Sequence, residues 1–148
     1  MEKLHLISAD TLFYQPLDHP KMLIDGILSN GLAILSGDSK IGKSWMVLWL
    51  CLKISRGEPV WGLPTAKTDV IYLALEDNDW RIQQRMQELI DEPPKNLHFG
   101  FSCGKLGAEL EGQIKGVLED NPNTGLLFID TLQMVRDNVS SRVNAYAQ

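Results

Sequence analysis

The sequence predicts an α/β fold in which a mostly parallel central sheet lies between helices, as three layers. Two runs, 69–76 and 126–130, carry this prediction, because each is apolar and continuous and ends in an acidic residue. Such runs are typical of parallel strands that are covered on both faces. The third observation is a glycine-rich loop at 37–44, which lies between a short apolar run and a long apolar helix pattern.

Composition sets the limits for the function. The 148 residues are 44% hydrophobic and 22% charged, which suits one globular domain with a sizeable core. The net charge of -5 gives no basic footprint of the kind that duplex-binding surfaces leave. Cys51 and Cys103 form no spaced framework, so we expect a reducing, cytoplasmic setting. No run approaches 18 apolar residues and no signal peptide is evident, so no membrane partner is expected.

The glycine-rich loop carries the most specific motif of the chain. Residues 37–44 read G-x-x-x-x-G-K-S, which is the P-loop pattern. The preceding run, 32–36, is the expected strand, and the helix that follows is expected to reach about Ser55. The predicted nucleotide-binding residues are Gly37, Asp38, Ser39, Lys40, Ile41, Gly42, Lys43, Ser44 and Trp45.

The residue types of this loop match the chemistry of a phosphate site. Gly37 and Gly42 let the backbone curl so that successive N–H groups point at phosphate oxygens, at the positive end of a helix dipole. Lys43 is predicted to bring its charge to the β- and γ-phosphates as a catalytic residue, and Ser44 to ligate Mg²⁺. Trp45 and Trp49 could stack on a base, although packing in the core is the more common use of such a pair.

Acidic residues follow the second expected strand. Glu76 and Asp77 end the run at 70–75, and ligand chemistry in parallel sheets collects at the carboxyl ends of strands. Glu76 is therefore a predicted catalytic residue that activates a water for attack on the γ-phosphate. The alternative is that these acids cap the helix expected at 79–90, a role that suits Asp77 or Asn78 better.

That helix, 79–90, carries an apolar stripe and a polar face. Arg81 and Arg85 fall on the polar face, where a solvated surface is the more common outcome than a contact with a neighbouring subunit. Further expected elements are a strand at 97–101 and a helix at 105–119.

The last apolar run supplies the second metal ligand. Residues 126–130 are four large apolar residues followed by Asp130, the Walker B form. An Asp at the tip of a strand can bind Mg²⁺ directly or through water, beside Ser44. The pattern is weak by itself, but it gains weight because it follows a P-loop with strands between.

Three segments together resemble a known family. The residues GDSKIGKSW, YLALED and LLFIDTLQMVR are similar to the RecA-like P-loop ATPases, and most similar to the RepA-type replicative helicase and AAA-domain branch of plasmids, phages and mobile elements. The resemblance covers about residues 20–148. It implies ATP and Mg²⁺ as cofactors, ATP hydrolysis, single-stranded DNA as a partner and a hexameric ring. It also implies the catalytic role of Glu76 and the Walker B role of Asp130.

The resemblance also sets expectations for domains and topology. We expect an N-terminal extension, 1–31, that packs on a RecA-like core at 32–148. Within the extension, Ser8 is expected to cap a short helix, and 22–28 to form a short strand or a hairpin. Eighteen residues follow Asp130. The core is therefore expected to be incomplete at its C-terminal end, without the sensor strand that lies between the Walker B strand and the P-loop strand.

Three outcomes are open for the sheet, because a missing strand leaves a slot of about 10 Å. They are a gap beside 32–36, a strand borrowed from another chain, or direct pairing of the two flanking strands. Two alternatives to a DNA motor are also open, namely a nucleotide-binding fragment without turnover and a small-molecule kinase.

Overall fold

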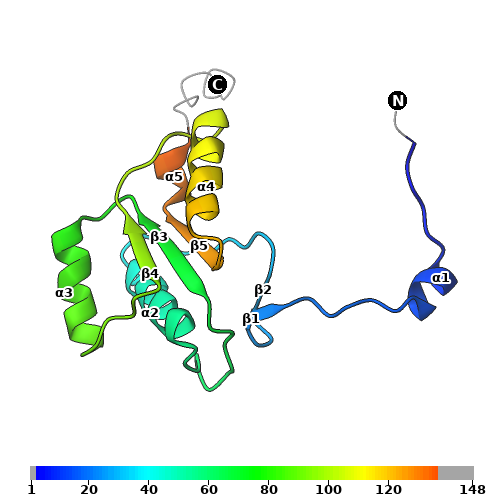
Figure 1. The fold of residues 1–148 in the computed structure, drawn as a ribbon, viewed down its shortest axis with the longest axis horizontal. Helices are drawn as coiled ribbons and strands as arrows, with labels where there is room; N and C mark the ends of the chain where they lie inside the picture. Colours follow the sequence, from blue (N-terminus) through cyan, green and yellow to red (C-terminus); the bar gives the residue numbers. More distant parts are fainter. Residues whose placement is uncertain (1–2, 137–148) are drawn as a thin grey trace, which may run out of the picture.

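The computed structural model describes residues 3–136. Figure 1 shows a sheet with helices around it and an N-terminal arm that runs away from this body. The elements in chain order are α1 (Ala9–Tyr14), β1 (Met22–Ile24), β2 (Leu28–Ser29), α2 (Lys43–Arg56), β3 (Asp69–Ala74), α3 (Asp79–Leu89), β4 (Leu97–Gly100), α4 (Ala108–Asp120), β5 (Thr124–Asp130) and α5 (Leu132–Val135).

The main sheet has three parallel strands in the order β4-β3-β5. This confirms the predicted α/β class. Ala74 pairs with Asp130 in register, and the Leu75 N–H donates to the Asp130 carbonyl at 2.9 Å. The carboxyl ends of β3 and β5 therefore meet at one edge, where the predicted acidic residues lie.

Helix α2 is the centre of the core. Seven of its residues are buried, because its sequence is apolar on nearly every face, as the pattern predicted. It ends at Gly57, whose φ of +68° is a left-handed conformation that glycine adopts without a steric penalty. Among the described residues, no helix has the length and apolar character needed to cross a membrane.

The side chains of β3 alternate between two faces of the sheet. Val70, Tyr72 and Ala74 belong to the main apolar cluster, which also contains α2 residues. Ile71 points to the opposite face, where it is also buried, and it does not belong to that cluster. Because both faces are apolar, β3 reads as a continuous run rather than as an alternating one.

The N-terminal segment contacts the core through its hairpin. Strands β1 and β2 pair antiparallel, as expected, and Ile24 is 2% exposed. The Ala66 N–H donates to the Leu23 carbonyl, which ties the hairpin to the loop after α2. Helix α1 begins after its cap Ser8, also as expected, but it buries none of its residues.

The strand expected at 32–36 is not formed, which corrects the sequence prediction. Leu32 is 96% exposed, Ile34 76% and Leu35 47%, and the segment pairs with no strand in the described part of the chain. A strand needs a neighbour for its backbone hydrogen bonds, and here β5 is the outermost strand. Of the three outcomes considered, the described residues resemble the gap.

Paired leucine substitutions test this correction. Leu48 is fully buried, so Leu48→Ala is expected to lower the free energy of unfolding by about 2–5 kcal/mol. Leu32→Ala removes the same atoms from an exposed site and is expected to change it by less than about 0.5 kcal/mol. Urea unfolding measures both. A cost at Leu32 equal to that at Leu48 would show that 32–36 is buried.

Candidate functional site

The predicted P-loop connects the hairpin to α2 and is exposed over 37–42. Gly42 has φ of +91° and Lys40 has φ of +62°, so the chain curls tightly just before the helix. The Lys43 ammonium turns back over this curl and donates to the carbonyls of Gly37 and Asp38. A Cβ at Gly37 would lie 2.8 Å from Ile41 Cδ1, the end of an exposed side chain that can turn away.

Ser44 and Asp130 are brought together although 86 positions separate them. The Ser44 hydroxyl donates to Asp130 Oδ2 at 2.8 Å. Ser44 lies in the first turn of α2, and Asp130 is the last residue of β5. The two predicted metal ligands thus share one point at the carboxyl edge of the sheet.

Tyr72 is a site residue that the sequence prediction missed. Its hydroxyl donates to the same Asp130 Oδ2 at 2.8 Å, while its ring is fully buried near Phe99 and Phe128. Burial, together with the charge of Asp130, raises the pKa of Tyr72 far above its usual value, so the hydroxyl stays protonated. A signal was present, since Tyr72 shares a face with Ala74, the register partner of Asp130.

Glu76 lies beyond the end of β3 and is exposed. Its Oε1 accepts a hydrogen bond of 3.1 Å from the hydroxyl of Thr131, the residue after Asp130. The predicted base therefore lies at the same edge of the sheet as the Ser44–Asp130 pair. Thr131 was not singled out from the sequence, because a threonine after a strand has many uses.

The residues after Glu76 divide their roles. The Asn78 side chain caps α3 by accepting from the Arg81 N–H at 2.9 Å, as one of the two caps considered. Asp77 instead forms ion pairs, at 2.6 Å with Arg85 and at 3.7 Å with Arg81. The interpretation of both arginines as solvated is wrong for Arg85, whose side chain is only 19% exposed.

The two tryptophans of α2 differ in their surroundings. Trp49 packs against the core and lies 5.6 Å from the Trp61 ring, in line with the core interpretation. Trp45 is 38% exposed, and the Arg85 guanidinium lies 5.2 Å from its ring centroid. The side chain of Trp45 is therefore a partner of α3 rather than a core residue.

The donor set fits a hard divalent cation that binds together with a phosphate ligand. A hydroxyl and a carboxylate supply two oxygen atoms at one point. Mg²⁺ is commonly held by one or two protein oxygens, with phosphate oxygens and waters completing its octahedron.

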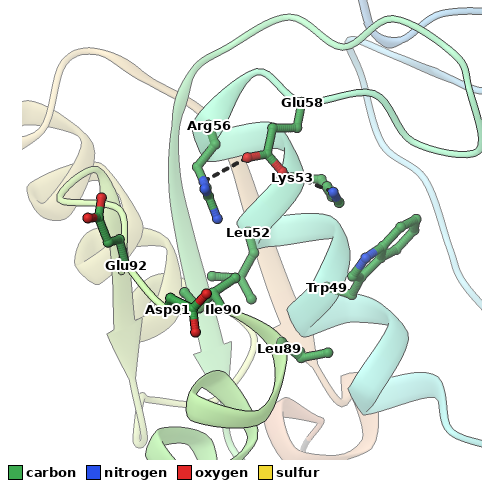
Figure 2. A pocket seen from close by; sticks show the side chains of 9 residues that line it. All are labelled: Trp49, Leu52, Lys53, Arg56, Glu58, Leu89, Ile90, Asp91 and Glu92. Carbon is green, nitrogen blue, oxygen red and sulfur yellow. Dashed lines mark hydrogen bonds and ion pairs between the residues drawn. The ribbon is translucent and has the colours of Figure 1, made fainter.

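A cavity of about 500 Å³ lies elsewhere, near the last turn of α2 and the end of α3 (Figure 2). Its cations are already paired, because Lys53 and Arg56 each lie 2.9 Å from a Glu58 carboxylate oxygen. The hydrogen bond from Lys53 is the main reason that the pKa of Glu58 is lowered. None of the predicted site residues lines this cavity.

Comparison with known proteins gives one match. A family model described as an AAA domain matches residues 2–147, which is nearly the whole chain. No curated protein and no solved structure matches the chain significantly.

Proposed function

Because this chain belongs to the AAA domain family, we propose that it binds Mg-ATP at 37–45 and hydrolyses it as part of a DNA-dependent motor. One observation carries the site assignment, namely the 2.8 Å hydrogen bond between Ser44 and Asp130. It joins the end of the P-loop to the Walker B acid without any contribution from the family match.

The binding role follows from the charges at the loop. Lys43 exchanges the carbonyls of Gly37 and Asp38 for phosphate oxygens of the nucleotide, which are stronger acceptors because they are charged. The first N–H groups of α2 face the same ligand, at the positive end of the helix dipole. Ser44 and Asp130 would hold Mg²⁺, which would neutralise charge that develops on the phosphates.

The catalytic role falls to Glu76. Its carboxylate accepts the proton of a water that attacks the γ-phosphate, and its exposed position gives that water access. The Thr131 hydroxyl donates to one carboxylate oxygen, Oε1, and we assign the proton transfer to the other, Oε2.

The motor part of the proposal rests on the resemblance to replicative helicases of mobile elements. Such motors act as rings on single-stranded DNA, so we propose a hexamer of this chain or of the protein it belongs to. Binding of single strands depends on local grooves and stacking aromatic residues, so a net charge of -5 does not exclude it.

Measurement of phosphate release tests both parts. Mg²⁺-dependent hydrolysis of ATP is expected, and addition of single-stranded oligo-dT is expected to raise its rate. ATP binding without any release of phosphate would contradict the ATPase proposal and favour a binding module. Hydrolysis that oligo-dT leaves unchanged, in a protein that mass photometry shows to be monomeric, would contradict the motor proposal alone.

Tyr72→Phe tests the support of Asp130. The substitution keeps the ring between Phe99 and Phe128 but removes the hydroxyl that orients the carboxylate. Loss of such a partner of a metal ligand typically costs about 10–100-fold in metal affinity. We therefore expect the Mg²⁺ concentration for half-maximal hydrolysis to rise by about that factor. An unchanged Mg²⁺ dependence would show that Tyr72 only fills space.

A further inference from the structure

Three residues from three elements form a cluster beside the site. Asp77 follows Glu76 at the end of β3, Arg85 lies in the middle of α3, and Trp45 lies in the first turn of α2. Arg85 Nη1 lies 2.6 Å from Asp77 Oδ2, and the Arg85 Cζ lies 5.2 Å from the Trp45 ring centroid. One guanidinium therefore contacts both the segment that carries the predicted base and the helix that follows the P-loop.

Burial distinguishes this ion pair from the other pairs of the described residues. The side chain of Asp77 is 9% exposed and that of Arg85 19%, whereas those of Lys115 and Glu111 are 69% and 65% exposed. Exposed pairs contribute little, because water screens them and both side chains lose freedom. Removing one partner of a buried pair instead leaves the other charge without compensation.

The chain around Glu76 has few other contacts that fix it. Strand β3 ends at Ala74, and Glu76 is exposed, with the 3.1 Å bond from Thr131 as its side-chain hydrogen bond in the described structure. Asp77 is fixed through both its backbone and its side chain. Its N–H donates to the Ala74 carbonyl at 3.3 Å, and its carboxylate binds Arg85. The position of Glu76 therefore depends on how firmly Asp77 is held.

We propose that Arg85 is a positioning residue for Glu76, which it holds in place relative to the P-loop helix through Asp77 and Trp45. This inference rests on the proposed function, because it assumes that Glu76 activates the attacking water. A general base contributes fully only when it is held within hydrogen-bond reach of the proton that it takes. The guanidinium suits this task, because it is flat enough to stack on an indole while its N–H groups bind a carboxylate.

Kinetics of Arg85→Ala test the proposal. We expect kcat for ATP hydrolysis to fall by about 10–100-fold, while KM for ATP and the Kd for ADP stay within about twofold. Arg85→Lys keeps a charge for Asp77 but loses the flat stacking surface, so it is expected to restore part of kcat. Arg81→Ala is the matched control, because Arg81 also faces Asp77 but at 3.7 Å and 55% exposed. It should leave kcat within about twofold.

The opposite pattern would overturn the proposal. If Arg85→Ala and Arg81→Ala have the same kcat, Arg85 does not position Glu76. If kcat and ADP affinity fall together with the thermal midpoint, and Arg85→Lys restores none of them, Arg85 serves the fold rather than Glu76.

Hydrogen exchange followed by NMR gives a second readout that needs no turnover. Arg85→Ala is expected to speed exchange of the Asp77 and Asn78 amides by about tenfold, while the Leu75 amide, bonded to β5, stays protected. Unchanged exchange at Asp77 and Asn78 would refute the inference. If the wild-type chain hydrolyses no ATP but Arg85→Ala still causes this selective loss of protection, the proposed function is contradicted, whereas the role of Arg85 in fixing Asp77 is retained.

Discussion

Glu76→Gln is expected to lower the rate of ATP hydrolysis by about 10²–10⁴-fold, the usual contribution of a general base. The amide cannot accept the proton of the attacking water. Its carbonyl oxygen can still accept the hydrogen bond from Thr131, so the side chain should keep its place. ATP affinity should therefore stay within about twofold of the wild type, which isothermal titration measures.

Glu88→Gln is the control for this substitution, because it removes an exposed carboxylate of α3 that lies outside the site. It should leave hydrolysis unchanged. A Glu76→Gln variant that turns over ATP at the wild-type rate would reduce Glu76 to a loop residue and require another base.

Lys43→Ala is expected to weaken ATP and ADP binding by about 10–100-fold. A hydrogen bond to a charged group contributes about 1.5–3 kcal/mol, and each 1.4 kcal/mol is a factor of ten in affinity. Helix α2 should still form, because alanine is a strong helix former at its first position. Isothermal titration of ADP measures the loss, and circular dichroism checks that the fold is kept.

Lys115→Ala provides the matched control for charge. It removes one positive charge from an exposed site in α4, where Lys115 pairs with Glu111. Nucleotide affinity should not change. If Lys43→Ala binds ADP as tightly as Lys115→Ala does, the P-loop pattern does not mark the binding site.

The sequence predicted the parts of the fold that depend on local pattern. Helix α2 and strands β3 and β5 lie where their apolar runs indicated. The prediction of a strand at 32–36 was wrong, because an apolar run does not reveal whether a neighbouring strand exists to pair with it. Leu32 and Ile34 are as apolar as the residues of β5, yet they lie in solvent.

The site residues could be predicted where a sequence motif specifies both the residue and its role. The two motifs predicted that Ser44 and Asp130 would lie together, and they do so because α2 packs against β3, the strand that pairs with β5. The roles of Tyr72 and Arg85 were not predicted, because their partners lie outside their own elements. Asp130 is 58 positions from Tyr72, and Asp77 is 8 positions from Arg85. An arginine on a polar helix face looks solvated until the neighbouring helix supplies Trp45.

A ¹⁵N-HSQC titration of the chain with Mg-ADP tests the central claim most directly, because it reports where nucleotide binds without requiring turnover. We expect the largest amide shifts on residues 37–45 and on Asp130, and weaker shifts in Lys43→Ala. Shifts concentrated instead at Trp49, Lys53 and Arg56, around the cavity at the other end of α2, would contradict it. A spectrum that Mg-ADP leaves unchanged would contradict it as well.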